Sequence, residues 1–253
     1  MHLPLQDKHI VITGGASGIG ADTAQLVAER GAKVVIGDLN AEAGEKLASH
    51  IVAMGAEAAF IPLDVTNSES VTTFYQGAIE RYGDIDVGLN NAGIDHFPAA
   101  MHELPDEALD INYAVNVKGV WLCMKALLAN MLPRQQGHII NLASVAGIKG
   151  SPMISAYCAS KHAVIGLTKS TALEYAKANI RINAVCPSFV NTPMVTRTLS
   201  RLPEKNQQQI IRANAFKRLG EPHEVSGAIA WLCTDESSFM TGHSVVLDGG
   251  LTA

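Results

Sequence analysis

Tyr157 and Lys161 stand four residues apart in the segment "SAYCASK" at 155–161. On a helix, positions i and i+4 lie on one face, so an ammonium group there would lie close to the phenol. A free phenol loses its proton near pH ~10, and a neighbouring positive charge lowers that pKa, which makes tyrosine usable as an acid or base. Such pairs also occur on ordinary exposed helices, so this spacing needs support from the rest of the chain.

A glycine-rich segment, "TGGASGIG" at 13–20, lies between an apolar run and an amphipathic one. Gly14, Gly18 and Gly20 leave the backbone bare, so a diphosphate can approach its amides, and the start of a helix adds a partial positive charge. Glycines in turns are often only turn residues. The position after a strand and before a helix favours phosphate binding.

Asp38 closes the next apolar run, "KVVIGD" at 33–38. A carboxylate at this place can accept hydrogen bonds from the ribose hydroxyls of an adenosine, and it repels a 2′-phosphate. Leu39 and Asn40 supply no cation that would hold such a phosphate. The pattern therefore favours NAD over NADP, and the alternative is a surface aspartate at a turn.

Short apolar runs alternate with amphipathic segments along the whole chain. The amphipathic segments are 18–30, 41–54, 68–82, about 104–131 and 155–178, and the predicted strands are 9–13, 33–38, 58–64, 86–91, 138–144, 180–186 and 243–248. Strands without polar alternation are buried on both faces, which is typical of parallel sheets covered by helices. We therefore expect an α/β fold of the doubly wound Rossmann type, as a single domain over 1–253 with a seven-stranded parallel sheet and helices on both faces.

Composition excludes several classes of function. The chain has 253 residues, 47% of them hydrophobic, and a formal net charge of −5, with no basic run that would indicate a nucleic-acid partner. The longest apolar stretch, "GVWLCMKALLANML", is broken by Lys125, and the polar start does not resemble a signal peptide, so no membrane partner is expected. The four cysteines are far apart, which indicates reduced thiols, a cytoplasmic protein and no metal site.

These segments together resemble the short-chain dehydrogenase/reductase family, in its single-domain form of about 250 residues. The matching marks are "TGGASGIG", Asp64 with Val65, "NNAG" at 90–93, Asn116, Ser144 in "INLASVAG", and "YCASK" at 157–161. Their order and spacing are specific to the family, although each motif alone is weak.

The resemblance implies a catalytic tetrad of Asn116, Ser144, Tyr157 and Lys161. Tyr157 would exchange a proton with the substrate hydroxyl while a hydride passes to the nicotinamide, and Ser144 would hold the substrate oxygen. Lys161 would bind the nicotinamide ribose and favour the ionised phenol. Asn116 would support a proton path to solvent. A serine after a strand is also an ordinary helix cap.

The resemblance also implies a set of cofactor contacts. Asp64 and Val65 would lie by the adenine, and Val190 and Thr192 would meet the carboxamide. The full set is Gly14, Ser17, Gly18, Ile19, Gly20, Asp38, Asp64, Val65, Asn91, Ala92, Gly93, Tyr157, Lys161, Pro187, Val190 and Thr192. Two departures from the family pattern are Ser188, in place of a glycine, and Gly88 inside a predicted strand, for which the sequence offers no functional reason.

The substrate is expected beyond the carboxyl ends of the strands. A segment at about 193–217 has the composition of a substrate-binding lid, with an ordinary pair of surface helices as the alternative. The predicted substrate contacts, Ser144, Ile94, His96, Ile154, Phe189 and Met194, are mostly apolar, which favours a small neutral alcohol, diol or ketone. His96 fits a solvated loop equally well.

The predicted activity is therefore NAD-dependent interconversion of a secondary alcohol or diol and its ketone, with Tyr157 as acid and base. The first alternative is a 3-oxoacyl-thioester reductase of the fatty-acid type, and the second is a dinucleotide-binding protein without turnover. The presence of both Tyr157 and Lys161 disfavours the second. The family resemblance implies a homotetramer.

Overall fold

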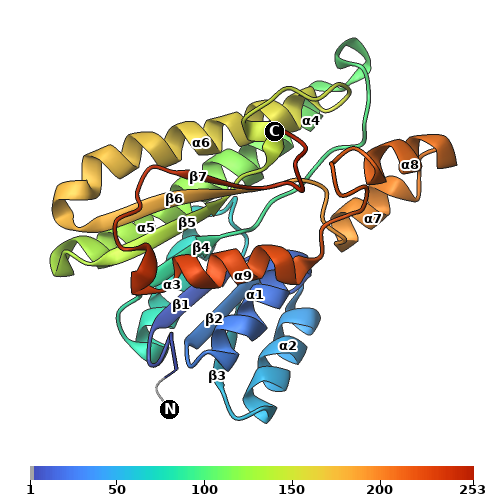
Figure 1. Cartoon of the computed structure of the whole chain (residues 1–253). Helices are drawn as coiled ribbons and strands as arrows, with labels where there is room; N and C mark the ends of the chain where they lie inside the picture. Colours follow the sequence, from blue (N-terminus) through green and yellow to red (C-terminus); the bar gives the residue numbers. More distant parts are fainter. Residues whose placement is uncertain (1–2) are drawn as a thin grey trace.

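Seven strands form one parallel sheet in the computed structural model, which describes residues 3–253 (Figure 1). Their order is β3-β2-β1-β4-β5-β6-β7. The strands are β1 (His9–Thr13), β2 (Lys33–Asp38), β3 (Glu57–Pro62), β4 (Val87–Asn90), β5 (Gly137–Leu142), β6 (Ile180–Pro187) and β7 (Ser244–Leu247). The predicted seven-stranded parallel sheet is confirmed, and every predicted strand overlaps an observed one.

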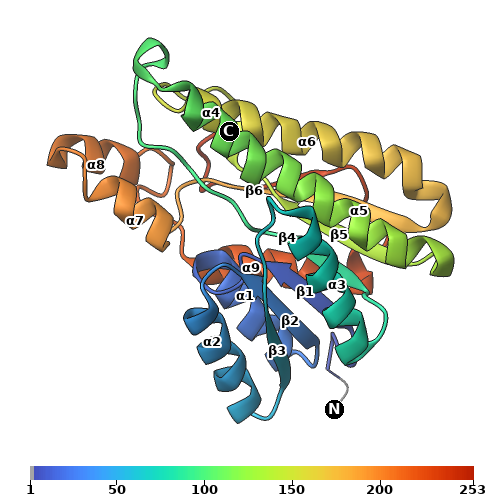
Figure 2. The same ribbon diagram turned by 180° about the vertical axis from the view of Figure 1, so that it is seen from behind.

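Helices cover both faces of the sheet, as predicted. In Figure 1 the near face carries α1 (Gly18–Glu29), α2 (Ala41–Ala53) and α9 (Pro222–Leu232). Figure 2 shows the other face, covered by α3 (Ser68–Tyr82), α5 (Val120–Met131) and α6 (Ser155–Tyr175). Each face has its own apolar core, because successive strand residues point to opposite sides. In β1, for example, Ile10 and Ile12 join the core under α1, whereas Val11 joins the core under α3 and α5.

The strand order creates a crevice at the carboxyl end of the sheet. From β1 the chain proceeds outward to β2 and β3, and it then returns to place β4 on the other side of β1. The loops that leave β1 and β4 therefore run in opposite directions. Ligands of doubly wound proteins bind at this switch point.

One predicted helix is interrupted in the structure. The segment expected as a continuous helix at about 104–131 consists of α4 (Asp106–Tyr113), a π-helical turn (Ala114–Gly119) and α5. The wider turn contains Asn116, whose buried amide bonds to groups outside the helix, and π turns are often found at functional sites. The whole stretch Asp106–Arg134 is apolar and long enough to cross a membrane by composition, but its apolar side packs in the core beneath the sheet.

Gly88 in β4 has a packing role that the sequence did not reveal. A Cβ atom at this position would lie 2.2 Å from Cδ1 of Leu127 on α5, far inside van der Waals contact. The glycine therefore lets α5 lie directly on the central strand of the sheet.

Two short helices stand away from the sheet beside its carboxyl end. They are α7 (Pro193–Leu199) and α8 (Glu204–Ile211), which project to one side of the molecule in both views (Figures 1 and 2). The Thr192 hydroxyl caps α7 by accepting a hydrogen bond from the amide of Val195, at 3.4 Å. No residue of α8 is buried, so this helix contributes little to the core.

Candidate active site

The glycine-rich loop leads from β1 into α1 at the edge of a large cleft. Ser17 is the N-cap of α1, but its side chain makes no capping hydrogen bond, and the first turn carries no acidic residue. The amides at the start of α1 therefore remain available to a ligand, with the partial positive charge of the helix behind them. Gly18 has a φ of +53°, in the left-handed region that favours glycine.

Gly14 and Gly20 serve the packing of this loop as much as any ligand. A Cβ on Gly14 would lie 2.6 Å from the Cα of Ala92, and a Cβ on Gly20 would lie 2.3 Å from the carbonyl oxygen of Gly14. The side chain of Asn91 fastens the loop from the other side, because its Nδ2 donates to the carbonyls of Thr13 and Gly14 at 3.0 and 2.7 Å. Gly20 itself does not line the cleft.

Asp38 lies at the carboxyl end of β2, where the sequence placed it. Its carboxylate accepts hydrogen bonds from the backbone amides of Ala16 and Asn40, both at 3.0 Å, which fix its orientation. A carboxylate can accept about four hydrogen bonds, so lone pairs remain for a ligand. Within the described residues, Lys161 is the only cationic side chain among those that line the cleft, and Asp38 and Asp64 are the anionic ones.

Tyr157 and Lys161 lie one turn apart on α6 and both reach the cleft. The ammonium nitrogen of Lys161 lies 5.7 Å from the centre of the Tyr157 ring. Lys161 donates a hydrogen bond of 2.8 Å to the carbonyl of Leu142, at the end of β5. This bond fixes a buried amine between the phenol and the sheet.

Burial dominates the proton affinity of both groups. It raises the pKa of Tyr157 to about 12, although a hydrogen bond with Ser144 opposes the rise. It lowers the pKa of Lys161 to about 8, because the charged amine loses its water. In the protein alone, desolvation of the phenol therefore outweighs the effects that lower its pKa. The expectation that Lys161 favours the ionised phenol together with the oxidised nicotinamide stays a prediction.

Ser144 follows β5 and points into the same end of the cleft. Its Oγ accepts a hydrogen bond from the amide of Ala146 at 3.1 Å, so it also caps the short helical turn that follows. Ser144 is thus both a cap of this turn and a residue that lines the cleft. Ser144 also lies near enough to Tyr157 to lower the pKa of the phenol.

Asn116 is fully buried and does not line the cleft. Its amide clamps both backbone groups of Ile94, accepting from the nitrogen at 2.8 Å and donating to the oxygen at 2.9 Å. The same Nδ2 donates to the Ser160 hydroxyl at 3.0 Å. Asn116 therefore connects the π turn, the loop after β4 and α6. A Cβ on Gly93 would lie 3.2 Å from the Asn116 Oδ1 and 3.4 Å from the Lys161 Nζ, so these three residues lie together.

Comparison with known proteins finds oxidoreductases that match nearly the whole chain. A family model described as enoyl-(acyl carrier protein) reductase matches residues 14–252. A 2,5-dichloro-2,5-cyclohexadiene-1,4-diol dehydrogenase of Sphingobium indicum is 38% identical over 98% of each chain. A 3-oxoacyl-[acyl-carrier-protein] reductase of Thermotoga maritima is also 38% identical over 98% of each chain.

The fold agrees with a solved structure. Levodione reductase superimposes with a TM-score of 0.93 at 34% identity, over 96% of this chain and 97% of the other. The chain belongs to the short-chain dehydrogenase/reductase family. It is therefore an oxidoreductase of the class that acts on CH–OH groups, and members of the family use a nicotinamide dinucleotide.

The cleft of this short-chain dehydrogenase/reductase fits such a dinucleotide. It has a volume of about 520 Å³, within the range of roughly 300–1,000 Å³ that is usual for ligand sites. It brings together almost all of the predicted cofactor residues, namely Gly14, Ser17, Gly18, Ile19, Asp38, Asp64, Val65, Asn91, Ala92, Gly93, Tyr157, Lys161, Pro187, Val190 and Thr192. Uncapped amides and the ordered Asp38 carboxylate give it polar partners of the required kinds.

The predicted substrate residues are only partly brought together. Ile94 and Met194 line the cleft with Ser144, whereas the others do not. His96 turns its Nδ1 to the carbonyl of Phe97 at 2.9 Å, and its buried Nε2 has no hydrogen-bond partner within residues 3–253. Ile154 is the N-cap of α6, and the Phe189 carbonyl accepts a hydrogen bond from the amide of Gly220.

Several lining residues were missed from the sequence. Ile111 and Val115 come from α4 and the π turn, and Leu142 and Ala143 come from the end of β5; the remaining ones are Leu39, Leu63, Thr66, Ser188, Pro193 and Val195. Ile111 and Val115 did carry a signal, because they are an apolar i, i+4 pair ahead of Asn116 and so share a helix face. Leu142 and Ala143 precede Ser144 directly in the chain.

Proposed function

We propose that this protein is an NAD-dependent dehydrogenase that converts a secondary alcohol or diol on a small neutral ring to the ketone, and catalyses the reverse reduction. The observation that carries the proposal is the meeting of Ser144, Tyr157 and Lys161 at one end of a cleft whose other end carries Asp38. An acid–base group and a ribose-binding carboxylate at opposite ends are what such a reaction needs.

In the proposed reaction the substrate hydroxyl lies between Ser144 and Tyr157. The Ser144 hydroxyl orients the substrate oxygen, and the Tyr157 oxygen takes its proton while the C–H bond releases a hydride. When bound, the oxidised nicotinamide supplies the acceptor for that hydride and a positive charge near the phenol. Lys161 would hold the neighbouring ribose hydroxyls, since its amine already lies fixed at the end of β5.

NAD is favoured over NADP by the charges at the adenosine end. A 2′-phosphate would meet the carboxylate of Asp38, and the neighbouring Leu39, which is 77% exposed, offers no compensating cation. Asp64 adds a second negative charge to this end of the cleft. Repulsion of this kind costs affinity for the phosphorylated cofactor and leaves that for NAD intact.

The substrate end supports a neutral and largely apolar molecule. Ile94, Met194 and Val195 supply apolar surface on the two walls of this end of the cleft. The name of the relative from Sphingobium indicum refers to a cyclic diol, which agrees with this lining. We therefore place cyclic alcohols and diols first among substrates.

A 3-oxoacyl-thioester reductase is the second candidate, favoured by the relative from Thermotoga maritima. The residues at the adenosine end distinguish the two, because such enzymes usually prefer NADPH. A dinucleotide-binding protein without turnover would need the acid–base group to be dispensable, and the arrangement around Tyr157 argues against this.

Absorbance of reduced nicotinamide tests the proposal. Cyclohexanol, cyclohexanediols and linear secondary alcohols are supplied with NAD or NADP, and an acetoacetyl thioester with NADH or NADPH. We expect turnover of ring alcohols with NAD, reduced by at least about 1,000-fold in Tyr157→Phe. Turnover of the thioester alone with NADPH would select the second candidate, and dinucleotide binding without any turnover would select the third.

We also propose a cytoplasmic homotetramer. Large apolar side chains are exposed on two surfaces: Trp121 and Leu173 on α5 and α6, at 50% and 83%, and Phe239 and Val246 near β7, at 107% and 39%. Exposed apolar surface of this kind marks contact sites, and two separate surfaces can build a closed assembly of four copies. Light scattering measures the mass, and a monomer at micromolar concentration would contradict the proposal.

The four free and buried cysteines suit a reducing compartment, which supports the cytoplasmic location.

A further inference from the structure

The carboxylate of Asp95 links the loop after β4 to helix α7. Its two oxygens accept hydrogen bonds from Nη2 of Arg197 at 3.0 Å and from Oγ1 of Thr198 at 2.9 Å. Asp95 is about 100 residues away from both partners in the chain, and its side chain is only 19% exposed. A second contact supports the first, because the guanidinium of Arg201 lies 5.8 Å from the centre of the Phe97 ring.

These contacts hold the two walls of the substrate end together. Ile94 lies on one wall, directly before Asp95, and Met194 and Val195 lie on the other, at the start of α7. Asn116 clamps the backbone of Ile94 from below, so the loop is fixed and α7 is the element that the Asp95 carboxylate secures. Asp95 itself does not line the cleft.

The charge of Asp95 also acts on the acid–base group, because Asp95 directly follows Ile94, which lines the cleft together with Tyr157. The negative charge of Asp95 raises the pKa of Tyr157, after burial and against the hydrogen bond from Ser144. The titratable and polar groups around the phenol come from every neighbouring element: Ser144 after β5, Cys186 on β6, Cys158 and Lys161 on α6, and Asp95 after β4.

We propose that Asp95 is a positioning residue that fastens α7 over the substrate end and sets the electrostatic environment of Tyr157. The inference rests on the proposed function, in which Tyr157 exchanges a proton with the substrate. With α7 docked, the guanidinium of Arg197 offsets part of the carboxylate's charge. When α7 moves away, that charge is left unpaired beside the phenol, so docking of α7 favours the phenolate that the oxidation needs.

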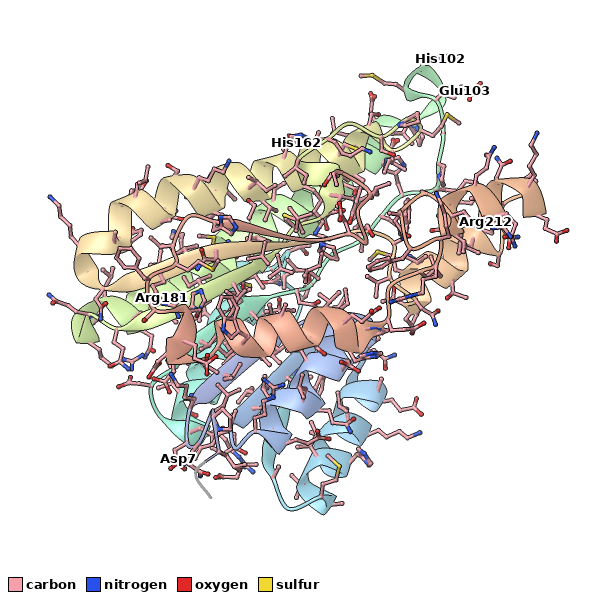
Figure 3. The ribbon with its side chains drawn as sticks, in the orientation of Figure 1. Asp7, His102, Glu103, His162, Arg181 and Arg212 are labelled. Atoms are coloured by element: carbon pink, nitrogen blue, oxygen red, sulfur yellow. The ribbon has the colours of Figure 1, made fainter. Side chains whose placement is uncertain are left out.

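Three variants separate the two roles of Asp95. Asp95→Asn removes the charge and keeps the shape, Arg197→Gln leaves the carboxylate without its cation, and Thr198→Val breaks one hydrogen bond without changing any charge. The matched control is Asp7→Asn, which makes the same chemical change at the amino end of the sheet. Figure 3 shows Asp7 far from the α7–α8 segment that carries Arg212.

The first measurement needs no turnover. Tyrosinate absorbance is followed against pH in each variant and in its Tyr157→Phe double variant, and the difference isolates the phenol of Tyr157. We expect the midpoint to move to lower pH in Asp95→Asn, by about half a unit. It should move to higher pH in Arg197→Gln, by less, because Arg197 is 58% exposed and therefore screened. Thr198→Val and Asp7→Asn should leave it in place.

The second measurement is the pH dependence of alcohol oxidation. The acidic limb of kcat for alcohol oxidation, where activity is lost as Tyr157 becomes protonated, should move in the same two opposite directions. Thr198→Val should instead raise KM by roughly three- to tenfold and leave this limb in place. Midpoints that move in the same direction in Asp95→Asn and Arg197→Gln, or in neither, would overturn the proposal. Absence of turnover in the unmodified protein would refute the proposed function instead, and the absorbance titration would still test Asp95.

Discussion

Replacement of Lys161 by methionine should abolish turnover and yet stabilise the protein near neutral pH. Lys161 is 4% exposed, and burial lowers the pKa of its amine from 10.5 to about 8. The folded protein therefore resists the charge that the unfolded chain carries freely. Methionine fills a similar volume without any charge to desolvate.

The magnitude follows from the two pKa values. A difference of about 2.5 units at about 1.4 kcal/mol per unit gives a penalty of about 3 kcal/mol below pH 8 in the unmodified protein. Loss of the hydrogen bond to the Leu142 carbonyl removes about 1–2 kcal/mol from the gain, so the variant should be more stable by about 1–2 kcal/mol at neutral pH. Because the folded pKa is the lower one, the penalty fades as the pH rises from about 8 to 10.5.

Urea unfolding at fixed protein concentration measures the effect. We expect the difference between Lys161→Met and the unmodified protein to shrink by about 1 kcal/mol between about pH 7 and pH 9. Lys169→Met is the matched control, since Lys169 lies exposed on the same helix, and its difference should not depend on pH in this window. A pH-independent difference for Lys161→Met would show that the buried amine carries no such penalty, and the reasoning would fail.

Three further predictions concern the cofactor end, the core and the acid–base group. The double variant Asp38→Ala/Leu39→Arg should shift the ratio of kcat/KM for NAD and NADP toward NADP by on the order of 100-fold. The reason is that a repulsive charge is replaced with an attractive one. An unchanged ratio would show that the cofactor is distinguished by other residues. Gly88→Ala should lower the free energy of unfolding in urea by about 1–3 kcal/mol. The loss should be smaller when Gly88→Ala is combined with Leu127→Ala, because the new methyl group meets that leucine. Additive losses in the double variant would contradict the contact. Ser144→Ala should lower kcat for alcohol oxidation about 100-fold. It should also move the acidic limb of kcat to higher pH, because Ser144 lowers the pKa of the phenol that must be ionised. An acidic limb that stays in place or moves to lower pH would exclude this role.

The fold could be predicted from the sequence because its evidence is local. Apolar runs such as "KVVIGD" show burial on both faces without knowledge of their neighbours, and the observed β2 has the same bounds, Lys33–Asp38. The alternation of strands and helices then restricts the topology to right-handed crossovers. Asp38 could be placed at the rim of the cleft for the same reason, since it closes a strand.

The features that escaped prediction depend on contacts between distant segments. The need for Gly88 comes from Leu127, on the helix that packs against its strand. The π turn around Asn116 depends on Ile94, a residue of another loop. The rise of the Tyr157 pKa depends on how completely the rest of the chain covers the phenol. Spacing along the sequence contains none of these quantities.

The order of the strands provides a physical reason for the layout of the cleft. β3 and β2 lead to Asp64 and Asp38, β1 leads to the uncapped amides of α1, and β5 leads to Ser144. Because these strands follow this order across one sheet, with β4 between β1 and β5, their ends present carboxylates, then backbone donors, then an acid–base group along a single line. A dinucleotide offers ribose hydroxyls, then a diphosphate, then a reactive ring in the same order. Each of these features alone is common among proteins, so the match in order is the stronger argument for the proposed cofactor.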